Sequence, residues 1–236
     1  MRAHMTAVMA AAIMIAGLMS GCAGSYQARS VDLKGAGTML VNPDILEKGE
    51  EGQALYRYVN PNAVISQYDK ILIDPILIYK DAELDASDLE NLQKLANNAY
   101  VYFRDELAKD YQVVTTPGPR TIRFQFAILD ADSSKPVRNL VSSVMPISIG
   151  LSLVKLAATG KQIGVGEITI ELRATDALTG QLIAAGLDRR VGGKSPSELV
   201  DSWTAAESAN QYWSKLSRYR ACQLRGAGAE CDKIKP

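Results

Sequence analysis

The chain has 236 residues, 26 of them basic and 26 acidic, and its hydrophobic content is 47%. This composition is ordinary for a globular protein and excludes collagen-like, coiled-coil and wholly disordered classes. Because the charges cancel, no net field would attract a polyanion, and we expect no nucleic-acid partner.

Residues 1–21 have the features of a lipoprotein signal peptide. Arg2 gives a short positive region, and residues 5–18 carry no charge, a stretch shorter than the roughly 20 residues of a spanning helix. The following Met19-Ser20-Gly21-Cys22 resembles a bacterial lipobox, with Met19 where leucine is usual. We expect Cys22 to be acylated and to become the new N-terminus. The alternative is a secretory signal followed by a chance cysteine.

The residue after the anchor bears on localisation. Ala23 stands where an aspartate would favour retention in the inner membrane. We therefore expect a protein held on the outer membrane by its acyl chains, palmitate among them, and facing the periplasm. This expectation assumes a Gram-negative source.

The cysteine count then leaves one pair. With Cys22 acylated, Cys222 and Cys231 remain, and export places them in an oxidising compartment. We expect a disulfide between them; two free thiols are the alternative. No histidine remains after processing, because the single one is His4, so we expect no metal site.

The mature chain divides into a tether and one domain. Residues 22–38, with several glycines and serines, indicate a tether near the lipid, and residues 39–236 a single periplasmic domain. Residues 39–68 lack periodicity and are expected to be mostly coil. Residues 70–79 predict a buried strand in which Pro75 marks a bulge or a one-sided position.

Helical patterns follow at two places. Ser87 to Glu90 forms a capping box, and apolar residues at steps of three and four predict a helix of about 22 residues. A second capping box, from Ser195 to Glu198, opens a C-terminal helix. Its expected buried stripe consists of Leu199, Trp203, Ala206, Ala209, Trp213 and Leu216.

Strand patterns occupy the region between these helices. Residues 111–115 predict a short strand, and residues 121–128, 165–175 and 182–191 predict longer ones, the first two with one solvated face. The expected fold class is α+β: a mostly antiparallel four- to five-stranded sheet with helices packed on one face.

The candidate chemistry is sparse. Without a histidine or a free thiol, we expect no catalytic residue of the Ser-His-Asp or Cys-His type, no cofactor and no enzymatic activity. Ser152 and Lys155 match S-x-x-K but lack its companion motifs. Residues 192–195 (GGKS) resemble part of a phosphate loop, yet Asp188 stands where that motif needs glycine. Both are better interpreted as chance.

Carboxylates could still perform acid–base chemistry. The candidates are Asp130, Asp132, Glu167, Glu171, Asp176 and Asp188. Glu167 and Asp188 fall on neighbouring predicted strands, and basic residues follow Asp188. We favour a charge cluster, suited to a partner, over catalysis. Its members are Glu167, Asp188, Arg189, Arg190 and Lys194.

Residues 139–154 carry no charge. The segment is too short to span a bilayer, so it is either core or a contact surface. If it is exposed, we expect a protein partner or self-association through residues 139–158.

Three stretches together resemble an uncharacterised family of proteobacterial lipoproteins, domain of unknown function 3313. They are residues 68–75 (YDKILIDP), residues 166–180, which open with Gly-Glu and end with Thr-Gly, and residues 188–194 (DRRVGGK). Trp203 and the Tyr212–Trp213 pair fit the C-terminal helix of the family. The resemblance covers roughly residues 40–220 and implies a localisation and a fold, but no activity.

Three functions remain open at this point. The leading hypothesis is a lipid-anchored interaction or assembly module. The first alternative is a carrier of an apolar ligand or lipid, which a dry apolar cavity would favour. The second is a carboxylate-dependent hydrolase of envelope polymers, which a pocket with two facing carboxylates would favour.

Overall fold

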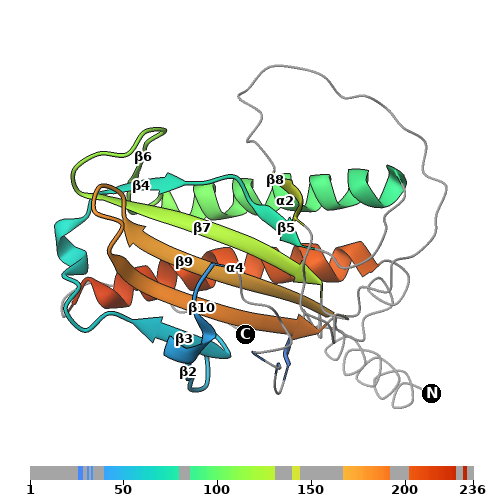
Figure 1. Ribbon diagram of the computed structural model, residues 1–236, viewed down its shortest axis with the longest axis horizontal. Helices are drawn as coiled ribbons and strands as arrows, with labels where there is room; N and C mark the ends of the chain where they lie inside the picture. The colour runs from blue at the N-terminus through green and yellow to red at the C-terminus, as the bar shows by residue number, and fades with distance from the viewer. Residues whose placement is uncertain are drawn as a thin grey trace, which may run out of the picture.

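The computed structural model describes residues 26–28, 31, 33, 40–79, 86–130, 140–143, 167–191, 202–226 and 231–232. Figure 1 shows the strands of this part of the chain and its helices. The strands are β1 (Tyr26–Gln27), β2 (Glu47–Lys48), β3 (Tyr56–Val59), β4 (Lys70–Ile73), β5 (Leu77–Tyr79), β6 (Gln112–Val113), β7 (Thr121–Asp130), β8 (Leu140–Ser143), β9 (Glu167–Asp176) and β10 (Leu182–Val191). The helices are the short 3-10 turns η1 (Pro43–Ile45) and η2 (Ile65–Gln67) and the long α2 (Ala86–Leu107) and α4 (Ser202–Leu224).

Within the described part, ten strands belong to one mixed sheet. Its main path runs β2-β3-β10-β9-β7-β4-β6, with β1 paired to β10 and β5 joining β7 to β8. The long strands β7, β9 and β10 are antiparallel, whereas β4 and β5 run parallel to β7, and β6 runs parallel to β4. The α+β class is therefore confirmed, but the expectation of a mostly antiparallel sheet of four to five strands is wrong.

Local features explain the larger sheet. Pro75 has no N–H group, and the predicted strand over residues 70–79 is interrupted there, so that β4 and β5 pair with successive parts of β7. Helix α2 then carries the chain back before β7 begins, and such a crossover allows parallel pairing. The two-residue strands β1, β2 and β6 are too short to show a hydrophobic period.

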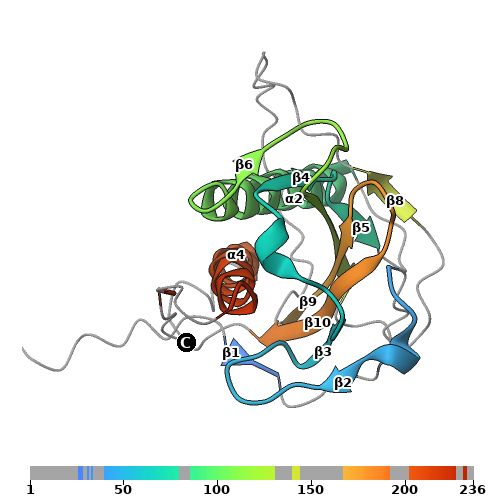
Figure 2. The same cartoon turned by 90° about the vertical axis from the view of Figure 1, so that its left-hand side faces the viewer.

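Both long helices cover the same face of the sheet (Figure 2). Their predicted apolar stripes are buried: Ala96, Ala99, Phe103 and Leu107 on α2, and Ala206, Ala209, Trp213 and Leu216 on α4. These side chains pack against Phe124, Phe126, Ile128, Ile168 and Ile170 of the sheet. Helix α2 begins at Ala86, so Ser87, the expected cap, lies inside the helix.

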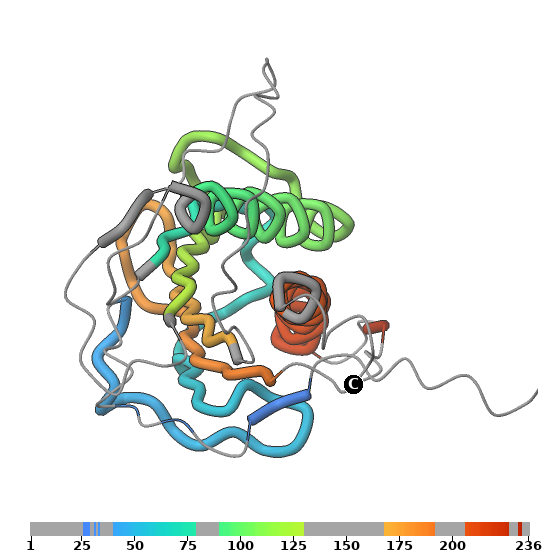
Figure 3. Tube along the Cα trace, turned by 90° about the vertical axis from the view of Figure 1, so that its right-hand side faces the viewer, coloured from blue at the N-terminus to red at the C-terminus, as the bar shows by residue number. Residues whose placement is uncertain are grey.

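The two helices lie next to each other on this face (Figure 3), and both run in the same direction along the sheet (Figure 1). The Asn98 side chain donates to Glu207, and further along both helices Arg218 donates to Asp110 at 2.9 Å. Residue numbers rise in the same direction along both helices between these two contacts, so α2 and α4 are parallel. The C-terminal end of α4 lies toward the end of the sheet where β3 joins β10.

The opposite face of the sheet is covered by the N-terminal part of the chain. Val31, Leu46 and Leu55 pack there against a second apolar cluster that includes Ala127, Leu129, Ala185 and Leu187. The prediction that this face of the strands is exposed to solvent is therefore wrong for the half that this cluster covers. At the other end of the same face, polar pairs such as Arg123 with Asp74 do lie near the surface.

Part of the expected tether packs on the domain. Tyr26 and Gln27 form β1 and pair with Val191 and Arg190 of β10, and Val31 is buried in the second cluster. The folded part of the chain thus begins within a few residues of Cys22 in the sequence.

Candidate functional site

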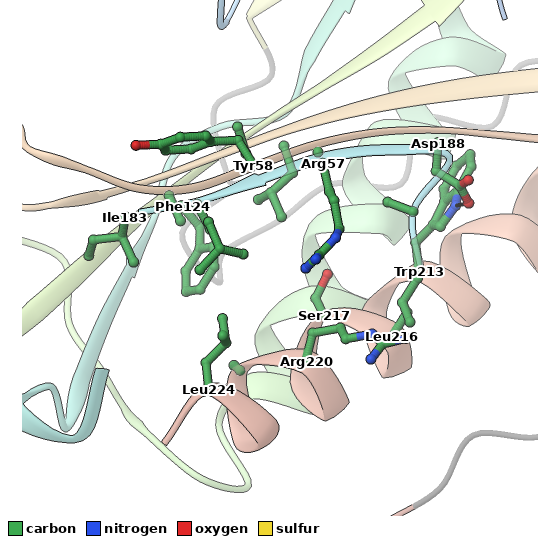
Figure 4. A pocket seen from close by; sticks show the side chains of 18 of the residues that line it. Arg57, Tyr58, Phe124, Ile183, Asp188, Trp213, Leu216, Ser217, Arg220 and Leu224 are labelled. Carbon is green, nitrogen blue, oxygen red and sulfur yellow. Dashed lines mark hydrogen bonds between the residues drawn. The ribbon is translucent and has the colours of Figure 1, made fainter. Parts of the chain in front are cut away.

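A cavity of about 330 Å³ lies between α4 and the helix-covered face of the sheet (Figure 4). Strands β3, β7, β9 and β10 form one side, and the C-terminal half of α4 forms the other. The lining is mostly apolar: Val59, Ile65, Phe103, Ile122, Phe124, Phe126, Ile170, Leu172, Ala174, Ile183, Ala184, Trp213, Leu216, Ala221 and Leu224. A cavity with these properties suits a small and largely apolar molecule.

Small residues on the sheet side create this space. Ala174 and Ala184 are register partners on β9 and β10, and Gly186 follows two residues later on β10. A Cβ atom at Gly186 would meet Ala54 Cβ at 3.6 Å and Tyr56 O at 3.7 Å, which are ordinary contacts. The backbone therefore does not require glycine there, and a glycine inside a strand often marks a close approach by another molecule.

Asp188 closes one end of the cavity and makes structural hydrogen bonds. Its Oδ2 accepts from Trp213 Nε1 at 2.7 Å, and its Oδ1 accepts from Leu55 N at 3.0 Å and from the Gln27 side chain. Burial raises the pKa of Asp188 above its ordinary value of 3.8, and these donors together with the nearby Arg190 oppose that rise. The carboxylate thus joins β10 to α4, to β1 and to the residue before β3.

Arg190 lies next to this end, also on the helix-covered face. Its guanidinium stands 3.6 Å from the centre of the Tyr212 ring, and the side chain is buried. Burial lowers the pKa of Arg190, while Tyr212 and Asp188 oppose that change. The Asp188–Arg190 pair therefore stabilises the contact between β10 and α4.

The mouth of the cavity is polar. Arg57 extends from β3 toward Ser217 of α4, and Arg220, one turn further along α4, also lines the cavity (Figure 4). The guanidinium of Arg220 donates to the Gly52 carbonyl and to Gln223 Oε1, and it lies over the Tyr219 ring. Among the residues that the structure describes, neither the Arg57 side chain nor the Ser217 side chain has a hydrogen bond, ion pair or ring contact.

The predicted charge cluster is divided by the sheet register. Asp188 and Arg190 come together beneath α4. Asp188 pairs with Ile170, whereas Glu167 pairs with Val191, three residues along the ladder. Arg189, between Asp188 and Arg190, alternates to the other face. Lys194 lies outside the described residues, as does the predicted lipidation site Cys22.

The C-terminal cysteines are joined. Cys222 and Cys231 form a disulfide with an S–S distance of 2.00 Å. The adjoining Asp232 accepts from Arg218, whose other contact is Asp110 just beyond α2. The disulfide and this bridge together hold residues 231–232 against the two helices.

The other candidate carboxylates take separate places. The Glu171 side chain is 0% exposed, and its two oxygens accept from Leu40 N at 3.2 Å and from Val41 N at 3.1 Å. Asp176 caps the β9–β10 turn by accepting from the backbone of Leu178 and Thr179, and these bonds lower its pKa. Asp130 ends β7, and Asp132 lies outside the described residues.

Several sequence features cannot be placed. Of the apolar segment 139–158, the structure describes residues 140–143, which form β8 and pair with β5. Ser152, Lys155, residues 192–195 and the predicted cap at Ser195 fall outside the described ranges, as does the side chain of Trp203. In the described part, no group of three His, Cys, Asp or Glu residues could hold a metal ion. No described helix is long and apolar enough to span a membrane.

Sequence reasoning missed the cavity and its mouth. The signal that could have found the cavity is Gly186, a glycine in the middle of the strand pattern LIAAGLDRRV. Arg57 and Arg220 are 163 positions apart in the numbering and come together only through the fold. No local pattern connects them.

Comparisons with known proteins place the chain in a family. The model of the family described as "Protein of unknown function (DUF3313)" matches residues 37–217, so the chain belongs to that family and the resemblance is confirmed. The "Uncharacterized lipoprotein YdcL" of Escherichia coli strain K12 is 28% identical over 141 residues, and the same protein of strain O157:H7 matches equally. Each match covers 59% of this chain and 59% of the relative, so the chain spans less than two thirds of the relatives' length.

A search of solved structures gives a distant likeness. The PelC dodecamer from Paraburkholderia phytofirmans aligns with a TM-score of 0.34 and 13% identity, over 65% of this chain and 91% of that chain. A single-substitution variant of the PelC dodecamer from the same organism gives a TM-score of 0.30, 12% identity, and coverage of 66% and 93%. These values carry no argument about the fold or function of this chain.

Proposed function

We propose that this chain is an outer-membrane lipoprotein, facing the periplasm, whose domain binds a small apolar molecule in the cavity beneath α4. The lipobox at Cys22, Ala23 after it, and relatives named as lipoproteins support the anchoring. The membrane is then one partner of the protein, through its acyl chains.

The binding function is proposed mainly because small residues on β9 and β10 leave the cavity open. Gly186, Ala174 and Ala184 leave space opposite α4, although a Cβ atom at Gly186 would make only ordinary contacts. Close packing is the rule in protein interiors, and larger side chains here would stabilise the domain by burying more apolar area. Keeping the space open therefore favours a ligand.

The same site argues against the hydrolase. Among the described lining residues, Asp188 carries the one carboxylate, and its oxygens accept from Trp213, Leu55 and Gln27. Acid–base hydrolysis of a glycoside needs a second carboxylate facing the first across the substrate. The interaction module stays a hypothesis for residues 139–158, most of which the structure does not describe.

Dye binding tests the proposal. The mature chain with Cys22→Ser needs no detergent, and a neutral naphthylamine dye reports an apolar site by its fluorescence. Gly186→Leu should fill the cavity and weaken dye binding by about tenfold or more, without lowering the melting temperature. Ala108→Leu introduces the same side chain at an exposed position after α2 and should leave binding unchanged. Equal dye binding by both variants would contradict the proposal.

A further inference from the structure

Two arginines from opposite walls, Arg57 and Arg220, line the polar mouth of the cavity, and neither side chain meets an acidic side chain in the part of the chain that the structure describes. Arg220 contacts a carbonyl, an amide oxygen and a ring, all of them uncharged. Arg57 is the register partner of Glu47 on β2, but no ion pair joins these two side chains. Within the described residues, neither guanidinium group therefore forms an ion pair.

The geometry suits one anionic group. Arg57 reaches the mouth from the sheet and Arg220 from α4, and the Ser217 hydroxyl lies between them (Figure 4). Guanidinium groups bind carboxylates and phosphates through paired, charge-assisted hydrogen bonds. Immediately below this polar mouth, the lining is apolar. A molecule that satisfies both regions has a charged head and a hydrocarbon chain.

The size of the cavity favours a single chain. Its volume of about 330 Å³ is near the lower limit of known ligand pockets, roughly 300–1,000 Å³. A phospholipid with two acyl chains would exceed that space, whereas a fatty acid or a lysolipid places one chain inside.

The attachment of the chain indicates where such a molecule would come from. The peptide links between Cys22 and Tyr26 span at most about 14 Å. Gln27, the next residue, donates to the Gln53 carbonyl and to Asp188, and both of these residues line the cavity. If Cys22 carries the lipid anchor, the cavity is held close to the bilayer surface.

We infer that the cavity accepts a single-chain anionic amphiphile from the membrane, with its head group between Arg57, Ser217 and Arg220 and its chain against the apolar lining. This inference rests on the proposed function and adds to it the chemical class of the ligand and its source. Each further methylene that the cavity buries should tighten binding about fourfold until the chain fills it.

The test uses the acylated full-length mature protein in phosphatidylcholine vesicles. The vesicles contain either photoreactive palmitic acid or the matching photoreactive alcohol, which has the same chain and no charge. After irradiation, mass spectrometry measures the labelling of peptides that line the cavity. We expect the acid to label these peptides about tenfold more than the alcohol does, as charge-assisted bonds to the head group would give.

Variants separate the head-group contacts from the cavity itself. Arg57→Gln should lower labelling by the acid about tenfold and leave labelling by the alcohol unchanged, and Arg57→Lys should restore part of the loss. Since the Arg57 side chain makes no hydrogen bond, ion pair or ring contact in the described part of the chain, the substitution should not alter the fold, which the melting temperature checks. Lys215→Gln, on the exposed side of the same α4, is the matched control for a lost positive charge.

Each outcome identifies which idea fails. Equal labelling by acid and alcohol, unaffected by Arg57→Gln but abolished by Gly186→Leu, would overturn the head-group inference and retain the apolar site. Labelling of neither kind in the cavity would overturn the proposed function as well. Labelling by free palmitic acid in solution, but not from vesicles, would overturn the membrane source.

Discussion

The two faces of the sheet each bury a carboxylate, and they enclose it in different ways. On the helix-covered face, Asp188 is held by Trp213 of α4, by Leu55 and by Gln27. On the opposite face, Glu171 accepts from the backbone of Leu40 and Val41. Both carboxylates thus fasten the N-terminal part of the chain to the central strands, but only the first does so beside a cavity.

The comparison suggests a division of roles. The helix-covered face supplies the large apolar core and leaves an unfilled space near the C-terminal end of α4. The other face closes with smaller side chains and with chain segments that follow the expected anchor. A face that binds a ligand needs rigid walls, and the carboxylate contacts provide them by fixing α4 and β3 to β10.

Removing Trp213 should have the largest effect. Trp213→Ala deletes a buried indole and one donor to Asp188, and we expect the free energy of unfolding to fall by about 3–5 kcal/mol. Trp213→Phe keeps a ring and removes the N–H, so its cost should be about 1.5–3 kcal/mol. Urea unfolding measures both values. A loss under about 1 kcal/mol for the alanine variant would show that α4 does not anchor this face.

Changes at Glu171 should act on the other face and more locally. Glu171→Leu leaves the N–H groups of Leu40 and Val41 without their acceptor, at a cost of about 1–3 kcal/mol. Glu171→Gln retains one acceptor oxygen and should cost less. Hydrogen exchange should show faster exchange at residues 40 and 41, while dye binding in the cavity stays unchanged. Weaker dye binding would show that the two faces are coupled.

The pH dependence should distinguish Asp188 from a surface carboxylate. Because burial raises the pKa of Asp188 above 3.8, the folded state keeps its proton to higher pH than the unfolded state does. The stabilisation from that proton is complete below pH 3.8 and is lost as the pH rises through the folded pKa. The free energy of unfolding should therefore fall across this window, by at most about 1.4 kcal/mol per pH unit.

Two variants isolate the Asp188 contribution. Asp188→Asn should remove this slope, so urea unfolding at several pH values should give a wild-type advantage that shrinks as the pH rises. Asp176 should contribute a pH dependence of stability with the opposite sign, since hydrogen bonds from Thr179 and Leu178 lower its pKa. Its stabilisation is present above pH 3.8 and is lost as the pH falls through the lowered pKa. If wild type and Asp188→Asn show the same dependence of unfolding free energy on pH, a group other than Asp188 is responsible for it.

Much of the helix-covered face could be predicted from the sequence. The apolar stripes of α2 and α4 repeat every three or four residues, and Ile122, Phe124, Phe126 and Ile128 alternate with smaller or polar residues. Such patterns record burial against a neighbour, so they identify core positions such as Trp213. The disulfide partners followed from counting cysteines.

The other face and the cavity could not be predicted in the same way. The residues that cover Glu171 are far away in the sequence and include Leu40 and Val41, which bind it through their backbone and so leave no side-chain signal. The expectation that one face of residues 165–175 is solvated failed at Glu171 for that reason. On this face of β7, polar residues give way to Ala127 and Leu129, and this change in the sequence indicates that another part of the chain covers the strand from there on. The cavity mouth depends on Arg57 meeting Arg220, which the fold alone brings about.

The smallest expected effect concerns a polar residue within the helix-covered face. The Asn210 side chain is 0% exposed, and neither its oxygen nor its nitrogen has a hydrogen-bond partner in the part of the chain that the structure describes. A buried amide without partners destabilises a protein, so Asn210→Leu, which keeps the branched shape and the number of heavy atoms, should raise the free energy of unfolding by about 1 kcal/mol. Asn210→Ala, which also removes the amide but leaves a void, should not give this gain. Thermal unfolding of the three proteins compares them, and a loss of stability in Asn210→Leu would show that the amide has a partner in the complete protein.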